Sequence, residues 1–422
     1  MTAIAKPKPT KLSLLKVADI VEHAGYTGII QSIIPSGVNK YLNLLLEAGD
    51  IRQILAKETD IIFKKRKDSD LAYKFDKACL ASIKAIRWNG GNLGSDPEMF
   101  VFDSVTKQVI PAFKFLDKNG GSDRTMDGEK LFWDGFQAEF NIKSGSCLDE
   151  RVNSTRFGLM SLRNKAKAFN PNAILTVQTT VDIAPELFAD AKPEHIAFGC
   201  TPSKNVYNME GIKMDGKDVP FRSAGGHIHY GLDKKEWKQI PEYVKALDKI
   251  LGVACVALFA KYDNPARRSM YGLAGEYRTP PHGLEYRTLS NAWLCHPTIM
   301  YIVYELSRKV IAMEQKGLMR FWDASEKETI ACINNCDVDK ALSILRRNDK
   351  VFKDLIKSFS YNDNNAKVIW NTFMLGVDAL VNTETIEDNW HLNANTFDYY
   401  NVRIQSMHEK LDKYNELLKV DV

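Results

Sequence analysis

The sequence predicts an α+β fold in which a strand-rich middle part lies between two helical ends. From about residue 12 to 88 the apolar residues recur every three or four positions, a spacing typical of amphipathic helices. The same spacing returns after about residue 296 and includes a last amphipathic stretch near 398–419. Between 89 and 295, short alternating segments are separated by Gly, Asp, Asn and Pro, which is typical of strands and turns. We therefore expect a helical N-terminal extension, a core and a helical C-terminal region, at residues 1–88, 89–300 and 301–422.

The composition excludes several classes of protein. A content of 45% hydrophobic and 26% charged residues fits a globular protein with a sizeable core. The net charge of +4 is too small to indicate nucleic-acid binding, but it leaves phosphate-bearing small ligands open. The seven scattered cysteines include no Cys-x-x-Cys pair, which favours a reducing cytosol over a disulfide framework or a zinc site. The longest apolar run, at 251–260, is too short to span a bilayer, so we expect a cytoplasmic protein that is not inserted in a membrane.

The middle part contains several candidate strands and two candidate helices. We expect helices at about 149–169 and 236–261, where apolar residues follow the helical period. The expected strands are the segments MFVFD, QVIPAF, FQAEFNI, AILTVQTTVDI, GHIHYGL and GLEYRTL.

The first polar motif is GSDPEMFVFD. Ser95 and Glu98, with Pro97 between them, could form a capping box that opens a helix. The apolar residues that follow favour a short strand instead, and proline is tolerated where a strand begins. On a strand, Asp96, Glu98 and Phe100 share one face because side chains alternate.

The second motif, WDGFQAEFNI, alternates over a whole strand. Its apolar residues face the core in this interpretation, and they are Phe136, Ala138, Phe140 and Ile142. Gln137, Glu139 and Asn141 then line the opposite face. A strand with one solvated face explains this pattern without any function.

The third motif, AGGHIHYG, contains two histidines two residues apart. His227 and His229 share one face of a strand, while Ile228 and Tyr230 point the other way. Two imidazoles in this arrangement can bind a metal or a phosphate, and the flanking glycines allow a ligand to approach closely. A structural accident explains such a pair equally well.

The fourth motif, EYRTPPHGLEYRT, repeats one tetrapeptide. Glu285 and Arg287 share a strand face, and Tyr286 points into the core. The pair is either an ordinary surface ion pair or a metal-binding carboxylate beside a guanidinium that binds phosphate. Arg278 precedes Pro280-Pro281, so we expect it on a loop, with Arg287 on a strand, and the repeat is not a duplicated unit.

The four motifs together indicate a nucleotide site. Hard oxygen ligands, imidazoles and arginines on strand faces suit Mg²⁺ or Mn²⁺ bound together with phosphates. The chain has no P-loop and no serine-hydrolase elbow, which excludes those two kinds of site.

The ordered series GSDPE, DGFQAEF, GGHIHYG, YGLAGEYR and GLEYRTLSNAWL, over residues 92–300, resembles the glutamine-synthetase-like carboxylate–amine ligases. It is most similar to the phage-type amidoligases, which also resemble glutamate–cysteine ligases. The resemblance implies a curved, mainly antiparallel sheet that forms an active-site funnel, with helices packed outside. It also implies ATP and two or three divalent cations, Mg²⁺ or Mn²⁺, between the phosphates and the strands.

Each role is carried over by matching the motifs. The resemblance implies five metal ligands, which are Asp96, Glu98, Glu139, His227 and Glu285. His229 resembles a contact to nucleotide phosphate or to substrate carboxylate. Arg278 and Arg287 resemble the arginines that hold the transferred phosphoryl group, and Arg268 is a weaker candidate for the nucleotide. Only Glu139 matches where glutamine synthetase has two glutamates, although Asp134 could substitute. Glu276 is expected to be an ordinary residue.

The resemblance implies ATP-dependent amide-bond formation through an acyl phosphate. Two alternatives remain open: a phosphotransferase of guanidino-kinase type, and a phage-associated structural or binding protein that kept the fold. The expected partners are a small-molecule or peptide carboxylate and an amine, without nucleic acid or membrane. The identity of both substrates and a homo-oligomeric state are left open.

Overall fold

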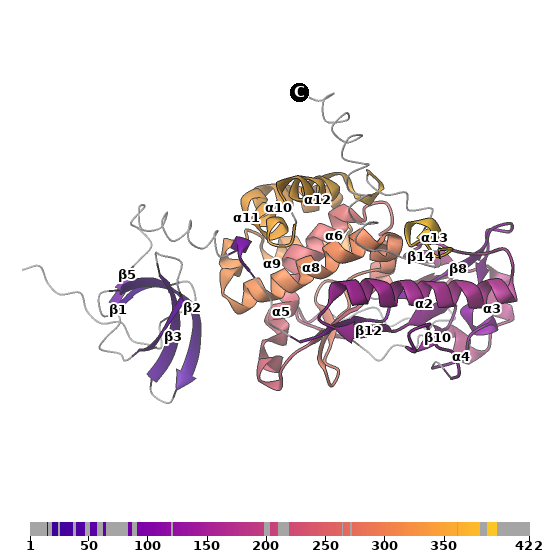
Figure 1. Ribbon diagram of the computed structural model, residues 1–422, viewed down its shortest axis with the longest axis horizontal. Coiled ribbons are helices and arrows are strands. Elements are labelled where there is room, and N and C mark those ends of the chain that lie inside the picture. The colour runs from indigo at the N-terminus through magenta and orange to yellow at the C-terminus, as the bar shows by residue number, and fades with distance from the viewer. Residues whose placement is uncertain are drawn as a thin grey trace, which may run out of the picture. The chain divides into compact units, whose positions relative to one another are not determined.

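The computed structural model describes most of the chain (Figure 1). The described residues are 15, 19–23, 26–36, 39–46, 51–56, 62–64, 83–86, 91–119, 121–197, 203–209, 219–263, 265–270, 272–360, 362–379 and 386–394. The expected amphipathic stretch near 398–419 lies outside them. The chain forms two compact units, one made of 1–88, 308–323 and 347–362, the other of 89–307, 324–346 and 363–422.

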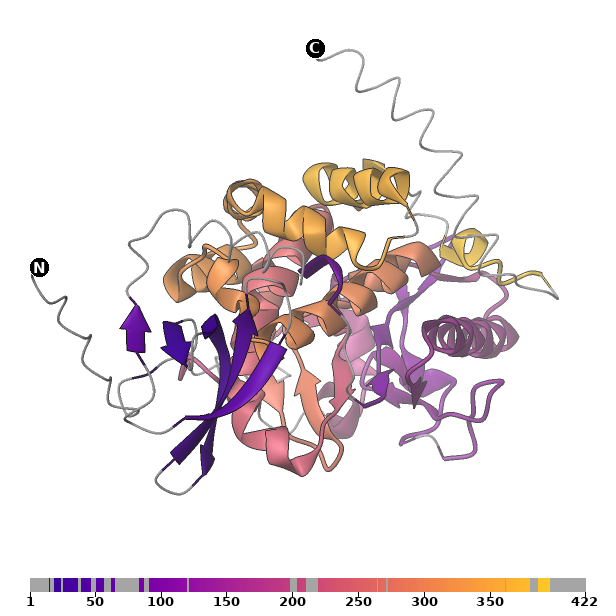
Figure 2. The same ribbon diagram turned by 60° about the vertical axis from the view of Figure 1, so that its left-hand side comes forward.

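The first unit contains an antiparallel sheet with the strand order β4-β3-β2-β1-β5. Its strands are β1 (Ile20–His23), β2 (Tyr26–Ser36), β3 (Asn39–Leu46), β4 (Ile51–Ala56) and β5 (Ile62–Lys64). Figure 2 shows the strong twist of this sheet, drawn in indigo. Its inner face buries a cluster made of Leu15, Val21, Ile30, Leu42, Leu44 and Ala56.

The helices expected between 12 and 88 are therefore wrong for residues 20–64. The register of β2 against β3 shifts between Ile30 and Ser32, as in a β-bulge. One extra residue reverses the alternation, so Ile30 and Ile33, three positions apart, both pack in the same cluster. This bulge imitates the three-residue spacing of a helix.

The first unit also includes helical segments from the second half of the chain. They come from the end of α8 (Pro297–Gln315), from η7 (Leu318–Phe321) and from α11 (Asp349–Lys357). Lys309 Nζ donates to the carbonyl of Ile86 at 2.9 Å, and Lys84 lies 3.5 Å from Asp354. The helical region expected from 301 onwards is thus divided between the two units.

The second unit is built on antiparallel sheets. The largest has the order β12-β6-β17-β19-β18-β15, and the next has the order β10-β11-β7. The strands of the first sheet are β12 (Ile142–Gly145), β6 (Leu93–Ser95), β17 (Ile228–Gly231), β19 (Gly283–Tyr286), β18 (Glu276–Arg278) and β15 (Lys204–Asn205). Those of the second are β10 (Leu131–Asp134), β11 (Gln137–Phe140) and β7 (Glu98–Met99).

Smaller sheets complete the strands of this unit. One has the order β13-β8-β9 and another pairs β14 with β16. Their bounds are β8 (Val101–Asp103), β9 (Val109–Ile110), β13 (Ala173–Leu175), β14 (Thr180–Asp182) and β16 (Phe221–Ser223). Every described strand pair is antiparallel, so the predicted α+β class is confirmed.

Helices cover the sheets of the second unit. The long helix α2 (Leu148–Phe169) runs alongside β12 in Figure 1, and Gly158 lets it approach the ring of Phe140 closely. A second helical run contains η4 (Lys234–Gln239), α5 (Ile240–Leu247), the π-helical turn η5 (Asp248–Gly252) and α6 (Val253–Leu258). Both expected helices are confirmed. Later helices are α7 (Pro265–Met270), α9 (Glu326–Asn334), α10 (Val338–Arg347), α12 (Asp363–Leu375) and α13 (Ile386–Asn389). Within the described part of the chain, no helix combines the length and apolar character needed to cross a membrane.

Candidate active site

The doubled tetrapeptide forms the two arms of one β-hairpin. Tyr277 pairs with Tyr286, Arg278 pairs with Glu285, and the amide of Arg287 donates to the carbonyl of Glu276 at 3.1 Å. Because antiparallel arms are read in opposite directions, the same three letters place a glutamate opposite an arginine at both ends. We expected Arg278 on a loop and Arg287 on a strand, and both expectations are wrong. Arg278 is the last residue of strand β18, and Arg287 directly follows strand β19.

The turn of this hairpin needs its glycine. The amide of Gly283 donates to the carbonyl of Pro280 at 2.9 Å, and its φ of +138° is favourable only for glycine. A Cβ there would lie 2.5 Å from the carbonyl oxygen of Tyr230 on β17. This close approach seats β19 between β17 and β18, in the middle of the largest sheet.

One face of the sheet is apolar and the other carries charged groups. Tyr286, Ile228 and Tyr230 are fully buried, as their alternation predicts. His229 pairs directly with Glu285, so both side chains lie on the opposite face.

The first group of possible metal ligands is on this charged face. One ligand atom from each of Asp96, His229 and Glu285 lies within 4.8 Å of the other two. Nε2 of His229 is 3.0 Å from Oδ1 of Asp96, and Nδ1 of His227 is 3.7 Å from the same oxygen. We call Asp96, His229 and Glu285 the histidine cluster. His227 borders it, with Nδ1 3.6 Å from Oε1 of Glu285.

A second group lies on the neighbouring sheet. Glu98 pairs with Glu139 across β7 and β11, and Asp134 ends β10. Ligand atoms of these three carboxylates lie within 4.8 Å of one another, and we call them the carboxylate cluster. The amide of Gly225 donates to Glu98 at 2.7 Å and fixes its orientation. The strand interpretation of GSDPE is confirmed for Glu98, which begins β7, whereas Asp96 lies between β6 and β7 and not on a strand. The structure brings all five predicted metal-ligand residues into one region.

Both arginines of the hairpin face a cavity of about 500 Å³, which we call the arginine cavity. Nη1 of Arg287 binds Oε1 of Glu285, and Nη1 of Arg278 lies 3.5 Å from the same oxygen. Arg287 is buried, whereas the side chain of Arg278 is 26% exposed. The cavity is also lined by Asp96, Glu98, Asp134, Glu139 and His227.

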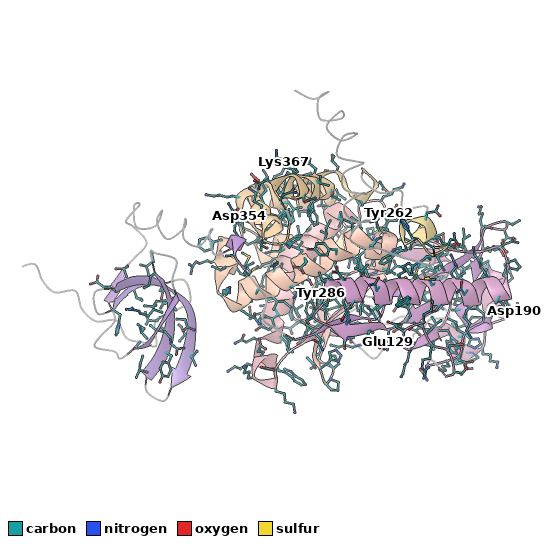
Figure 3. The ribbon with its side chains drawn as sticks, viewed as in Figure 1. Glu129, Asp190, Tyr262, Tyr286, Asp354 and Lys367 are labelled. Atoms are coloured by element: carbon teal, nitrogen blue, oxygen red, sulfur yellow. The ribbon has the colours of Figure 1, made fainter. Side chains whose placement is uncertain are left out.

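A second cavity of about 580 Å³ shares Asp96 with the first, and we call it the histidine cavity. His229 and His282 line it, with Nδ1 of His229 2.9 Å from Nε2 of His282. Lys143 and Glu129 supply the other charges (Glu129 is labelled in Figure 3).

The carboxylate cluster concentrates negative charge. Burial raises the pKa of Glu139 well above its usual range, and the carboxylates of Asp96, Glu98 and Asp134 raise it further. Burial also raises the pKa of Asp134, although Arg287 opposes this effect. Three carboxylates held this close suit a bound divalent cation, since oxygen ligands are those that Mg²⁺ prefers.

The two histidines are in different electrostatic states. Burial lowers the pKa of His227 well below its ordinary value, and the charge of Arg287 lowers it further. His227 is therefore neutral at pH 7 and keeps a lone pair for a ligand. Burial is the largest single influence on His229 and opposes its charging, but the charge and hydrogen bond of Asp96 together with the charge of Glu285 raise its pKa.

Residues 183–392, about half of the chain, match the family model of the phage phiEco32-like COOH.NH2 ligases, type 2. Residues 183–392 belong to this family. The segment contains His227, His229, Arg278, Glu285 and Arg287, and the resemblance found in the sequence is confirmed over this stretch. The strands that carry Asp96, Glu98 and Glu139 precede the ligase-family segment, and pairing of β17 with β6 joins the two parts.

No curated protein matches the chain. Among solved structures, a bifunctional glutathione synthetase from Pasteurella multocida is 10% identical, with a TM-score of 0.31. The match covers 79% of this chain and 54% of that synthetase, so the chain spans about half of its length. A likeness of this size supports no conclusion on fold or function.

Behind the charged face, a buried aspartate holds the hairpin of the ligase-family segment. The hydroxyl of Tyr286 (labelled in Figure 3) donates to Asp248 at 2.7 Å, and that of Thr288 donates to the same oxygen at 3.3 Å. Burial raises the pKa of Asp248 to about 7, although the hydrogen bond from Tyr286 opposes this shift. Asp248 lies in the π-helical turn η5, a type of distortion common near functional sites.

Arg268, a predicted nucleotide contact, and Glu276, the glutamate of the first copy of the repeat, bind groups outside the two cavities. Arg268 pairs with Asp263 at 3.1 Å, donates to the carbonyl of Thr288 at 2.6 Å, and lines neither cavity. Glu276 accepts a hydrogen bond from the amide of Gly272 at 2.9 Å and belongs to neither cluster. Both support the backbone around the hairpin.

Sequence reasoning missed several residues that line the cavities. Lys118, Trp133 and Glu194 line the arginine cavity, and Lys143 and His282 line the histidine cavity. Trp133 lies in the second motif and His282 in the fourth, between the two copies of the repeat, but neither was assigned a role. The other three belong to no motif, and the fold brings them to the site.

Proposed function

We propose that this protein is an ATP-dependent carboxylate–amine ligase that forms an amide through an acyl phosphate. The observation that carries the proposal is the convergence of the carboxylate cluster, the histidine cluster and two arginines on cavities that share Asp96. The ligase-family match of residues 183–392 supports it.

The residues present fit divalent cations. Each cluster offers three ligand atoms within 4.8 Å, and carboxylate oxygens predominate. Asp96, His229 and Glu285 would hold one cation, and Glu98, Asp134 and Glu139 a second. Bound Mg²⁺ or Mn²⁺ would neutralise the phosphate charges of ATP. His227, neutral and beside the first group, is a further ligand candidate.

Arg278 and Arg287 are the proposed phosphoryl-binding residues. A guanidinium binds phosphate oxygens with two parallel hydrogen bonds, and it keeps its charge when buried. The contact of Arg287 with Glu285 fixes its direction before any substrate binds. Such preorganised charge is what phosphoryl transfer requires.

The proposed reaction has two steps. A substrate carboxylate oxygen attacks the γ-phosphorus of ATP, the bond to the β-phosphate bridging oxygen breaks, and ADP leaves. The amine nitrogen then attacks the acyl carbon, the bond to the phosphate oxygen breaks, and inorganic phosphate leaves while the amine loses a proton. Positioning of the two substrates supplies much of the rate enhancement.

The proposed partners are small-molecule or peptide substrates, and the proposed location is the cytoplasm. Neither cavity identifies the amine substrate. The test therefore uses hydroxylamine, a nucleophile that reacts with acyl phosphates in general. Hydroxylamine converts acyl phosphates to hydroxamates, which give a coloured iron complex.

The experiment incubates the protein with ATP, Mg²⁺, hydroxylamine and a panel of carboxylic acids. We expect hydroxamate and ADP in equal amounts with the wild type, and none with Glu285→Gln. Glu276→Gln is the matched control from the other copy of the repeat and keeps activity. A stable phosphorylated product without hydroxamate would instead favour a phosphotransferase, and nucleotide binding without turnover would favour a non-catalytic role.

A further inference from the structure

The strand that carries Glu98 is held only weakly by its own sheet. β7 contains two residues, and among the described strands it pairs only with β11, at the edge of the sheet. Buried main-chain groups need hydrogen-bond partners, so the open edge of β7 has to be satisfied by groups from elsewhere in the chain. The orientation of Glu98 therefore depends on what lies along this edge.

Gly225 occupies part of the open edge. The amide of Glu98 donates to the carbonyl of Gly225 at 2.9 Å. The amide of Gly225 in turn donates to the carboxylate of Glu98 at 2.7 Å. One glycine thus binds both the main chain and the side chain of this candidate metal ligand.

Asn291 binds the carbonyl of Glu98. Its Nδ2 donates to that carbonyl at 2.9 Å and to the carbonyl of Gln178 at 3.3 Å. The main-chain amide of Asn291 donates to the carbonyl of Ala224 at 3.3 Å. Because its side chain is completely buried, Asn291 ties together three segments that are far apart in the sequence. Both main-chain groups of Glu98 are therefore held from outside the sheet of β7.

The turn that begins with Asn291 is locked to the glycine segment. This 3-10 turn, η6 (Asn291–Cys295), is the SNAWL end of the motif series, to which no role has been assigned. Ser290, directly before it, forms an antiparallel bridge with Gly225. Nε1 of Trp293 donates to the carbonyl of Gly226 at 3.1 Å, and a Cβ on Gly226 would collide with the Trp293 ring. A change in η6 is therefore transmitted to Gly225 and to Glu98.

Restraint of the main chain matters here because the carboxylate cluster repels itself. Ligand atoms of Glu98, Asp134 and Glu139 lie within 4.8 Å of one another. Burial and the neighbouring carboxylates raise the pKa of Glu139. If the main chain were not held, the three carboxylates would separate, and a cation would have to bring them together again. Removal of a group that orients a metal ligand lowers metal affinity by about 10–100-fold.

We propose that Asn291 is a positioning residue that holds Glu98 in the geometry required to bind a divalent cation. It acts through the main chain of Glu98 and through Gly225, and it belongs to neither cluster and lines neither cavity. This inference rests on the proposed ligase function and adds a residue that prepares its cation site.

The test is calorimetric titration of Mn²⁺, without ATP, into the wild type, Glu98→Gln and Asn291→Leu. Leucine fills a similar volume but donates no hydrogen bond, so it separates positioning from loss of packing. We expect Mn²⁺ affinity to fall by about tenfold or more in both variants. The double variant should bind less than about twofold more weakly than Glu98→Gln alone, because both changes act on one ligand.

The hydroxamate assay gives a second readout of the same variant. Asn291→Leu should raise the Mg²⁺ concentration for half-maximal rate by about tenfold, and high Mg²⁺ should restore part of the rate. The milder Asn291→Ser keeps a hydroxyl that is too short to reach both carbonyls, and it should weaken Mn²⁺ binding by about threefold or more. It decides the question if Asn291→Leu does not fold.

Asn348→Leu in the first unit is the matched control. Asn348 is also buried, and its Nδ2 donates to the carbonyl of Asp323 at 3.0 Å. This variant should lower the melting temperature as Asn291→Leu does, because each leaves a carbonyl without its donor. Its Mn²⁺ affinity should change less than about twofold, since Asn348 lies outside the unit that contains the clusters.

Two results would overturn the inference: unchanged Mn²⁺ affinity in the Asn291 variants, or a double variant in which the two losses add. Glu98→Gln separates this failure from that of the proposed function. If Glu98→Gln weakens Mn²⁺ binding but the Asn291 variants bind like the wild type, only the positioning role is wrong. If Glu98→Gln binds like the wild type, or the wild type binds no Mn²⁺ with or without ATP, the proposed cation site is wrong and the inference fails with it.

Discussion

The two arms of the β18–β19 hairpin carry the same residues in different surroundings. On β19 and just beyond it, Glu285 belongs to the histidine cluster and Arg287 lines the arginine cavity. On β18, Glu276 instead holds the amide of Gly272, while Arg278 reaches the cavity with a quarter of its side chain exposed. β19 lies between β17 and β18, whereas the outer neighbour of β18 is the two-residue strand β15.

The tyrosines differ in the same way. Tyr286 is fully buried and donates to Asp248, whereas Tyr277 is half-buried. The place of a strand in the sheet, and not its sequence, therefore decides which glutamate of the repeat joins the histidine cluster. The same substitution at equivalent positions of the two arms therefore gives a matched pair of variants.

The largest difference is expected between the two glutamates. Glu285→Gln removes a charge from the proposed cation site, and we expect kcat to fall by about 10²–10³-fold or more. Glu276→Gln keeps an oxygen that can accept from Gly272, so kcat should change less than about threefold. Hydroxamate formation by the two variants measures this difference. An equal loss of kcat in both variants would contradict the different roles of the two glutamates.

The arginines should differ less, because both line the arginine cavity. Lysine keeps the charge but loses the two-pronged hydrogen bonding, so both Arg287→Lys and Arg278→Lys should lower kcat. The loss should be about 10²-fold at buried Arg287 and smaller at Arg278, which is partly exposed. Steady-state kinetics with ATP as the varied substrate test this order, and a larger loss at Arg278 would contradict it.

The tyrosines should differ in stability. Tyr286→Phe leaves the buried carboxylate of Asp248 without its closest donor, which should cost about 1–3 kcal/mol of unfolding free energy. Tyr277→Phe should stay within about 0.5 kcal/mol of the wild type. Urea unfolding of the three proteins measures both values. A similar loss of unfolding free energy in the two variants would mean that the hydrogen bond from Tyr286 to Asp248 adds no stability to its arm.

Asp248 also makes stability depend on pH. Its pKa is about 7 in the folded protein and near 3.8 when unfolded, so the folded state binds the proton more tightly. The stability that it contributes is therefore full below about pH 4 and is lost as the pH rises towards 7. Thermal unfolding from pH 4 to 8 should show this decline in the wild type and a weaker one in Asp248→Asn. Identical profiles would contradict the assignment.

The sequence allowed most of the site to be predicted because strand alternation is local. Phe136, Ala138 and Phe140 alternate with Glu139, and this alone gives the correct face. The histidine pair and Glu285 follow the same rule, and the motif order showed that these strands belong together. The pairing of Glu98 with Glu139 and of His229 with Glu285 was then found in the sheets.

Other features depended on contacts between distant parts of the chain. The bulge in β2 changed the spacing of Ile30 and Ile33 to that of a helix. The repeat looked like two unrelated segments because nothing local shows that a Pro-Pro turn closes a hairpin. Lys118 and Glu194 are 76 residues apart, and long-range contacts such as the stacking of His195 on Phe113 bring their segments together.

The most direct test of the account is calorimetric titration of ATP into the wild type, Glu285→Gln and Glu276→Gln, each with Mg²⁺ and with a chelator. We expect Mg²⁺-dependent binding in the wild type and in Glu276→Gln, and a loss of at least about tenfold in affinity in Glu285→Gln. ATP affinity that is equal in all three proteins, or that does not depend on Mg²⁺, would contradict the claim that Glu285 on β19 belongs to a cation site.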